Sequence, residues 1–316
     1  MSARPPVTPA GPAPVRIDVD HVSRWFGNVV AVNDVSFTVG PGITGLLGPN
    51  GAGKSTLLHV MSGFLKPSAG AVRIGDEPAW LNPGMFRRVG LVPEREATYG
   101  FLTGREFVRL AAKLQQLPDP EAAAARAIAT VEMGEAQDRA TGGYSKGMKQ
   151  RIKVAAAIVH DPQVLVLDEP FNGMDPRQRL HLMDLLREMA AAGRTILFSS
   201  HILEEVERLA DSVLVIVAGR LAASGNFREI RRLMTDRPHT FRIRSSNNRE
   251  LGAAMLAQPS VSGIELDDGA MSVRVADFRG FTRALPKVAR DRQVTLLEVA
   301  PSDESLESVF SYLVRR

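Results

Sequence analysis

The sequence contains no cysteine, which excludes disulfide bonds, thiolate metal sites and a cysteine nucleophile at once. It also lacks any apolar run that approaches the ~18 residues of a bilayer-spanning helix, and its longest runs, such as Val213–Ala218, have strand length. Neither sign of charge is in large excess, because 39 Lys and Arg face 35 Asp and Glu, a net charge of +4. So small an excess gives no argument for a nucleic-acid partner, and none is expected. The chain is not expected to cross a membrane by itself.

The remaining composition is that of an ordinary globular protein. The 316 residues are 44% hydrophobic and 23% charged, and at roughly 150 residues per domain they suit about two domains. Residues 1–14 hold five prolines among small residues, which predicts a disordered tail. This segment has no apolar stretch of the kind found in a signal peptide, so nothing suggests export of the chain.

Residues 15–236 alternate short β-rich runs with helical patterns, which predicts an α/β domain built on a parallel sheet. The run Gly42–Leu47 is expected to be a buried strand that leads through a glycine-rich turn into a helix over Lys54–Gly63. Val164–Leu167 has no polar face, as expected of a central parallel strand covered on both sides. Further strands are expected at Thr195–Ser199 and Ser212–Val217, and a further helix at Arg177–Ala192.

Two other stretches differ from this alternation. Residues 96–145 are helical in pattern and rich in alanine, as in Glu121–Val131, which predicts a helical subdomain inserted into the α/β domain. Residues 237–316 have the order β-α-β-β-α-β, the split βαβ or ferredoxin-like pattern, which predicts a small α+β domain. Its elements are expected at His239–Arg244, Arg249–Ala257, Ser260–Leu266, Ala270–Val275, Phe278–Arg290 and Gln293–Val299. A last helix is expected to begin near Ser302.

The segment that follows the first buried strand matches the pattern G-x-x-x-x-G-K-[ST], which binds the phosphate chain of a nucleotide. Its glycines let backbone N–H groups curl around the phosphates, and the next helix points its positive end at them. Lys54 is expected to reach the β- and γ-phosphates, and the Ser55 hydroxyl to hold Mg²⁺. The residues expected to bind the nucleotide here are Gly48, Pro49, Asn50, Gly51, Ala52, Gly53, Lys54, Ser55 and Thr56.

Two carboxylates, Asp168 and Glu169, directly follow the buried run Val164–Leu167. The carboxyl ends of parallel strands form the edge of the sheet at which ligands bind. Asp168 is expected to support Mg²⁺ through water, and Glu169 to point at the water that attacks the γ-phosphate. Adjacent carboxylates repel each other, so a bound cation between them and the phosphates accounts for the pair.

A third segment, Tyr144–Arg151, opens a helix that is expected to run to about His160, and it resembles the signature motif of ABC-type ATPases. The segment Asn172–Pro176 resembles the loop that follows the catalytic glutamate in that family. Ser199–His201 resembles the segment that carries the switch histidine, and Phe26 resembles the aromatic residue that stacks on adenine. The motifs follow the family's order, and the resemblance covers about residues 16–235.

This resemblance implies a P-loop ATPase domain that forms a head-to-tail dimer, either a homodimer or a pseudo-dimer, around two ATP molecules. In such a dimer, Ser145 and Gly147 of one chain face the nucleotide held by the other. The start of the helix at Ser145 suits this role, because its N–H groups form a second anion cradle. The resemblance makes Glu169 the general base. It also implies that His201 contacts the γ-phosphate and positions the attacking water.

Two departures from the family pattern bear on the metal and on the branch of the family. The family usually has glutamine in the loop between core and helical insertion, where this chain has Glu94. The carboxylate can still approach Mg²⁺, so Ser55, Asp168 and Glu94 are the expected metal residues, but it adds negative charge unless the metal is present. Lys146 replaces a common glycine and Tyr144 a common leucine, as in exporters of drugs, lipids or polymers.

We therefore expect the ATP-hydrolysing subunit of an ABC exporter, with ATP and Mg²⁺ as cofactors. The implied partner is a separate transmembrane permease that docks near Glu94–Phe101 and the helical insertion. The expected location is cytoplasmic, at the inner face of the cell membrane. One alternative is a soluble ATPase of the same type in DNA repair or translation. Repair ATPases insert long coiled coils, but no sustained heptads lie between Lys54 and Asp168. Another alternative is a regulator that uses ATP only as a dimerisation signal.

Overall fold

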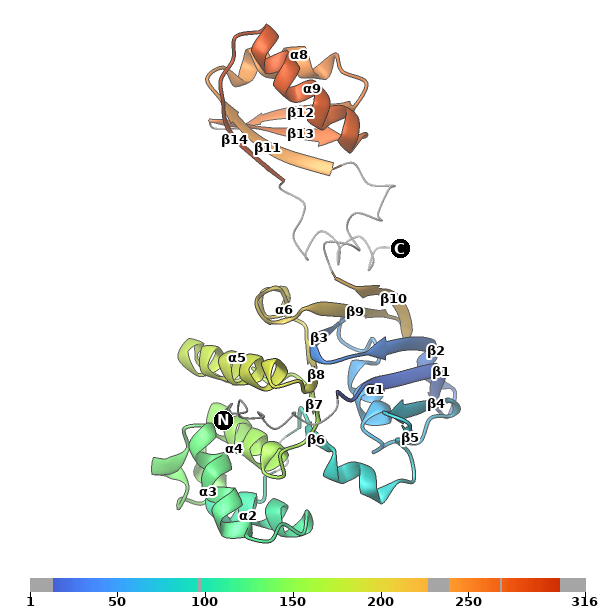
Figure 1. Ribbon diagram of the computed structural model, residues 1–316, viewed down its shortest axis with the longest axis vertical. Helices are drawn as coiled ribbons and strands as arrows, with labels where there is room; N and C mark the ends of the chain where they lie inside the picture. Colours follow the sequence, from blue (N-terminus) through green and yellow to red (C-terminus); the bar gives the residue numbers. More distant parts are fainter. Residues whose placement is uncertain (1–13, 96–97, 227–238, 268, 302–316) are drawn as a thin grey trace, which may run out of the picture. The chain divides into compact units, whose positions relative to one another are not determined.

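A computed structural model of the chain describes residues 14–95, 98–226, 239–267 and 269–301. The chain forms two compact units that divide between Gly225 and Asn226 (Figure 1). The boundary that the sequence predicts near residue 236 lies outside the described residues. The same holds for residues 1–13 of the expected tail and for the helix expected from Ser302.

The core of the first unit is a six-stranded sheet with the strand order β10-β9-β3-β8-β7-β6. Five of these strands run parallel, and β10 pairs with β9 in the antiparallel direction at one edge. All residues of β7 and β8 are buried, as is typical of central parallel strands that are covered on both faces. The strands are β3 (Gly42–Leu47), β6 (Val89–Val92), β7 (Val164–Leu167), β8 (Thr195–Ser200), β9 (Ser212–Val217) and β10 (Arg220–Gly225).

Three helices pack around this sheet: α1 (Lys54–Met61), α5 (Pro176–Ala191) and α6 (Leu203–Leu209). Helix α5 begins after Asp175, whose carboxylate accepts a 2.9 Å hydrogen bond from the backbone N–H of Gln178. Proline at the first helical position, Pro176, has no N–H that would need a partner there. The apolar stripe of α5, which includes Leu182 and Leu186, is buried.

A second, antiparallel sheet of the first unit has the order β2-β1-β4-β5 (Figure 1), and the sequence analysis did not predict it. Its strands are β1 (Ile17–Phe26), β2 (Val29–Val39), β4 (Ala69–Ile74) and β5 (Glu77–Pro78). One buried core joins Ile17 and Ile74 of this sheet to Leu57 of α1 and to Leu46 and Val166 of the parallel sheet. Helix α1, which directly follows the phosphate loop, is therefore held between two sheets.

The predicted helical insertion is present between β6 and β7 (Figure 1). It contains α2 (Gly104–Leu114), α3 (Pro120–Thr130) and α4 (Lys146–Ile158), which pack on one another. Short 3₁₀ turns lie within the insertion at η2 (Gly134–Ala136) and η3 (Thr141–Gly143), and another, η1 (Pro83–Arg87), precedes β6. Helix α2 begins with a capping box, in which Thr103 and Glu106 each bond the other's backbone N–H. Helix α4 also contacts β6 and so links the insertion to the parallel sheet.

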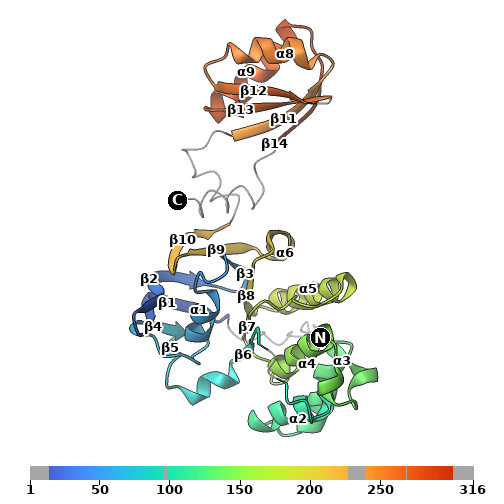
Figure 2. The ribbon, with the colours of Figure 1, turned by 180° about the vertical axis from the view of Figure 1, so that it is seen from behind.

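The second unit is the split βαβ fold that the sequence predicts. Its antiparallel sheet has the order β12-β13-β11-β14, and α8 and α9 cover one face (Figure 2). The core includes Phe241 of β11 and Phe281 of α9, whose rings stack with centroids 4.8 Å apart. The elements are β11 (His239–Ser245), α8 (Asn248–Leu256), β12 (Val261–Asp267), β13 (Ala270–Val275), α9 (Phe278–Asp291) and β14 (Leu296–Pro301).

No helix in the described parts of either unit combines the length and apolar character that crossing a bilayer requires.

Candidate active site

The loop between β3 and α1 requires glycine at two of its positions. Gly53 has φ +99°, and a Cβ there would lie 2.2 Å from the carbonyl oxygen of Ala31. A Cβ on Gly48 would lie 2.4 Å from the carbonyl oxygen of Ile216. Both approaches are closer than any side chain tolerates, and the positive φ of Gly53 is itself unfavourable for other residues. The loop therefore has the tight backbone path that a phosphate cradle needs.

Lys54 holds its ammonium group inside this loop. The side chain is buried, and Nζ donates hydrogen bonds to the carbonyl oxygens of Gly48 at 2.8 Å and Pro49 at 3.2 Å. A buried ammonium needs such partners because the loss of hydration is costly. The positive charge is thus fixed beside the N-terminus of α1, where Ser55 and Thr56 form the first helical turn.

The acidic pair lies at the carboxyl end of β7 and is organised by a serine from the neighbouring strand. Asp168 is 2% exposed, and its Oδ1 accepts a 2.6 Å hydrogen bond from the Ser199 hydroxyl of β8. The same Ser199 oxygen accepts a 2.8 Å hydrogen bond from the backbone N–H of Glu169. Glu169 has φ +49°, a left-handed conformation that costs a non-glycine residue of order 1 kcal/mol and often marks functional sites.

Glu169 and His201 form a direct pair. Nδ1 of His201 lies 2.9 Å from Oε2 of Glu169, and the carboxylate is buried while nearly half of the imidazole is exposed. A bond at Nδ1 orients the ring and leaves Nε2 as the nitrogen that can contact a bound phosphate. The structure thus brings together two residues that are separated by 32 positions in the sequence.

A third buried carboxylate, that of Glu205 in α6, connects the segments on either side of this pair. Its oxygens accept hydrogen bonds from the Ser200 hydroxyl at 2.6 Å and from Arg179 at 3.1 Å. Arg179 in turn donates to the carbonyl oxygen of Met174, in the loop before α5. Burial raises the pKa of Glu205, and the bonds from Ser200 and Arg179 oppose that change. Neither this network nor the role of Ser199 was predicted, because neither has a sequence motif of its own.

Five of the predicted site residues border a single cleft of about 600 Å³: Phe26, Ser55, Thr56, Glu94 and Asp168. They come from β1, α1, the segment after β6 and the end of β7. A volume in the range of about 300–1,000 Å³ is typical of small-molecule sites. The guanidinium of Arg24 lies 4.5 Å from the centre of the Phe26 ring, which gives this lining residue a cation–π contact.

The residues around this cleft fit a magnesium ion that arrives with a nucleotide. Among the described residues, no group of three or more His, Asp or Glu side chains is arranged to hold a metal by itself. Magnesium, however, is usually bound through one or two carboxylates together with waters and substrate phosphates. The Ser55 hydroxyl and the carboxylates of Asp168 and Glu94 border the same cleft and offer that set of oxygens.

Ser145 and Gly147, in contrast, do not line this cleft within one chain. Ser145 caps α4, and its hydroxyl oxygen accepts a 3.2 Å hydrogen bond from the backbone N–H of Met148. Gly147 is packed tightly, since a Cβ there would lie 2.5 Å from Oε1 of Gln178 and 3.0 Å from the carbonyl oxygen of Gly173. The first turn of α4 is therefore a second helix N-terminus, separate from the phosphate loop.

Comparison with known proteins gives the family. The ABC transporter family matches residues 32–172. The daunorubicin/doxorubicin resistance ATP-binding protein of Streptomyces peucetius is 32% identical over 303 residues, which cover 93% of this chain and 91% of that protein. The Nod factor export ATP-binding protein I of Burkholderia lata is 40% identical over 214 residues, 66% of this chain and 70% of that protein.

Further matches cover about two thirds of the chain. An uncharacterized ABC transporter ATP-binding protein of Nostoc is 39% identical over 210 residues, and the match spans 64% of this chain and 62% of that protein's length. Among solved structures, an ATP-binding subunit of an ABC transporter has a TM-score of 0.63 at 32% identity, covering 68% of this chain and 92% of that one. A dimeric bacterial ABC transporter cassette, 20% identical with a TM-score of 0.63 and covering 66% of this chain and 98% of that one, shares the fold. An identity of 32% over nearly the whole chain shows that this protein belongs to the ATP-binding proteins of ABC transporters, a family of ATPases.

Proposed function

We propose that this chain is the ATP-hydrolysing subunit of an exporter, and that it dimerises around ATP and drives a separate permease. The observation that carries the proposal is the 2.9 Å pair of Glu169 and His201, beside a buried Asp168 at the same strand end. A chain that only bound ATP would have no need of a buried carboxylate that is oriented by a histidine. The catalytic roles below are part of the proposal.

ATP binds with its phosphates in the loop Gly48–Thr56 and its adenine on Phe26. The ammonium of Lys54 and the N–H groups at the start of α1 bind the β- and γ-phosphates. Ser55, Asp168 and Glu94 would hold Mg²⁺, which when bound would neutralise charge on the phosphate oxygens. Burial of Asp168 and its bond from Ser199 keep that carboxylate in one orientation.

Glu169 accepts the proton of the water that attacks the γ-phosphate. Its backbone N–H is anchored to Ser199, and its Oε2 is anchored to His201, so the carboxylate stays in place as the water approaches. Nε2 of His201 then contacts the γ-phosphate. General-base catalysis of this kind typically contributes ~10²–10⁴-fold to the rate.

The second anion cradle, at Ser145 and Gly147, serves the nucleotide of another subunit. A helix N-terminus attracts phosphate through its N–H groups and its dipole, and here it lies apart from the cleft of its own chain. Two chains placed head to tail, as a homodimer or as a pseudo-dimer with a related chain, complete both sites. ATP then joins the subunits, and hydrolysis releases them.

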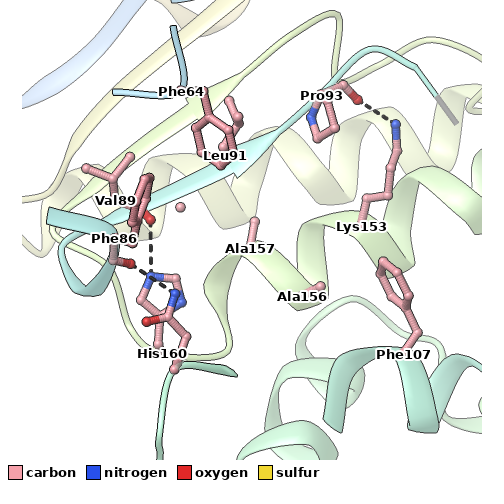
Figure 3. Close-up of a pocket in the computed structure, with 12 residues that line it drawn as sticks. Phe64, Phe86, Val89, Leu91, Pro93, Phe107, Lys153, Ala156, Ala157 and His160 are labelled. Carbon is pink, nitrogen blue, oxygen red and sulfur yellow. Dashed lines mark hydrogen bonds between the residues drawn. The ribbon is translucent and has the colours of Figure 1, made fainter. Parts of the chain in front are cut away.

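The permease docks on an apolar groove between the parallel sheet and the helical insertion (Figure 3). This groove has a volume of about 320 Å³ and is lined by aromatic and aliphatic side chains that include Phe86, Leu91, Phe107 and Ala157. Phe86, which lines this groove, is 36% exposed. Exposed apolar side chains next to a groove are typical of a partner site. Docking there would keep the subunit in the cytoplasm, at the inner face of the membrane.

The names of two relatives support transport out of the cell. One is named for resistance to daunorubicin and doxorubicin, and another for export of Nod factor. These names favour an exporter over an importer, and they favour transport over DNA repair, translation or regulation. The transported molecule is a property of the permease, whose residues contact it.

Replacing Glu169 with glutamine tests the proposal, because the amide keeps the shape of the side chain but cannot accept the proton. Phosphate release by the purified chain should fall by ~10²-fold or more. Size-exclusion chromatography with Mg-ATP should show a dimer that persists. Glu204→Gln, at an exposed position of α6, is the matched control and should leave both unchanged. Normal turnover in Glu169→Gln would contradict the catalytic assignment.

A further inference from the structure

A buried lysine that belongs to none of the motifs joins α4 to the segment that carries Glu94. Lys153 lies in α4 and is 5% exposed. Its Nζ donates hydrogen bonds to the carbonyl oxygens of three consecutive residues, at 2.6 Å to Pro93, 3.1 Å to Arg95 and 3.4 Å to Glu94. Figure 3 shows the side chain reaching from α4 to Pro93.

The number and type of these partners have a physical meaning. A lysine ammonium has three N–H donors, and these three carbonyl oxygens lie within hydrogen-bond distance of it. A charge that is almost fully buried is costly unless it is bonded in this way. Because these three acceptors are backbone atoms, the bonds to them hold the path of the chain at residues 93–95 directly.

The path of this segment matters because of what it presents to the nucleotide. Glu94 borders the 600 Å³ cleft together with Ser55 and Asp168. Helix α4, which anchors Lys153, begins at the cap Ser145. The stem of Lys153 also lines the groove of Figure 3. A single side chain thus joins the helix of the second anion cradle to the metal side of the first site.

We propose that Lys153 is a positioning residue for the magnesium nucleotide. It holds the backbone of residues 93–95 against α4, and so keeps the Glu94 carboxylate at the cleft. Lys153 itself contacts neither metal nor phosphate, and acts through Glu94. The inference uses one element of the proposed function, namely that Glu94 faces the magnesium ion.

Lys153→Met tests the inference, because methionine keeps most of the apolar stem but removes the three donors. Binding is measured with a fluorescent ATP analogue in a Glu169→Gln chain that does not turn over. Mutation of a residue that orients a metal ligand typically lowers metal affinity by 10–100-fold. The half-saturating Mg²⁺ concentration should therefore rise roughly tenfold. Affinity for the analogue in EDTA should not change. Lys113→Met, which removes an exposed charge on α2, should alter neither value.

A double-mutant cycle with Glu94→Ala, which removes the side-chain oxygens, separates positioning from a general structural role. If Lys153 acts through Glu94, adding Lys153→Met to Glu94→Ala should cause little further loss of Mg²⁺ affinity. If the losses of Mg²⁺ affinity in the two single variants instead multiply in the double variant, the proposal is overturned. An equal loss of nucleotide affinity with and without Mg²⁺ would also overturn it. Should Lys153→Met not fold, Lys153→Arg serves in the same cycle. The planar guanidinium of arginine cannot reproduce three converging bonds, so this variant should show part of the same Mg²⁺-specific loss of affinity.

These measurements record binding rather than turnover. Absence of phosphate release from the wild-type chain would therefore overturn the proposed function, but the binding measurements on Lys153→Met could still be interpreted. Conversely, normal hydrolysis with no Mg²⁺-specific effect of Lys153→Met would overturn only the positioning role.

Discussion

The Ser199 hydroxyl donates a 2.6 Å hydrogen bond to Oδ1 of Asp168, from β8 to the end of β7. The same oxygen accepts a hydrogen bond from the backbone N–H of Glu169. One small side chain therefore sets the orientation of the proposed metal carboxylate and the backbone of the proposed general base. The geometry of the acids depends on the neighbouring strand as much as on their own.

Ser199→Ala should be destabilising and should slow turnover. It leaves a buried Asp168 oxygen without its donor, which costs about 1–3 kcal/mol, and frees the backbone at Glu169. Urea unfolding measures the first effect and phosphate release the second. Ser224→Ala, on an exposed position of β10, should stay within about 0.5 kcal/mol of wild type. Wild-type turnover in Ser199→Ala would show that the serine does not organise the site.

Gly53→Ala should abolish nucleotide binding. The residue has φ +99°, and the added Cβ would lie 2.2 Å from the carbonyl oxygen of Ala31, so the loop must move. Fluorescent-nucleotide titration measures the loss. Gly134→Ala is the contrast, because φ is not positive there and a Cβ would have no heavy atom within 4 Å. That change should leave binding intact and stabilise the fold by a few tenths to about 1 kcal/mol.

Two histidines should make the free energy of unfolding depend on pH in opposite directions. Burial lowers the pKa of His160 below 6.5, so the contribution of this residue to the free energy of unfolding is present above pH 6.5 and is lost as pH falls through the folded pKa. His160→Gln should flatten this loss. The bond to Asp34 raises the pKa of exposed His21, so its contribution is present below pH 6.5 and is lost as pH rises. Urea unfolding at several pH values checks both signs. A steeper acid loss in His160→Gln would contradict the first assignment.

Phe86→Ser should weaken the association with the permease and spare ATP hydrolysis by the isolated subunit. Phe86 lines the groove of Figure 3 but not the nucleotide cleft. Pull-down from detergent-solubilised membranes measures the association. Leu180→Ser, which changes an exposed apolar residue of α5, should leave it unchanged. Equal losses in the two variants would mean that the groove is not the docking site.

Most of the parallel sheet was predictable because its central strands are short runs of mainly apolar residues. The run Val164–Leu167 forms β7 with the predicted bounds. In the second unit, Ala270–Val275 forms β13 with the predicted bounds. The strand expected at Gln293–Val299 begins later, at Leu296. The reason is local: Gln293 has φ +53°, so the chain turns after α9 before it can extend.

The parts that the sequence does not reveal are those that depend on which segments become neighbours. The antiparallel sheet was missed because β1 contains irregularities, including His21 at φ +47°, and these break its alternation. The role of Ser199 depends on β8 pairing with β7, and strand order has no local signal. Lys153 is indistinguishable in sequence from any lysine of a helix. Its function is visible only where α4 meets residues 93–95.

The left-handed backbone of Glu169 has an evolutionary consequence. Its N–H is held by Ser199, in a bond that does not involve the carboxylate. A single substitution by an unbranched residue can therefore end hydrolysis and leave the phosphate loop and the shape of the subunit intact. After a gene duplication, one copy could diverge in one step into a silent ATP-binding partner of the other. β-Branched residues would be disfavoured at this position throughout such a lineage.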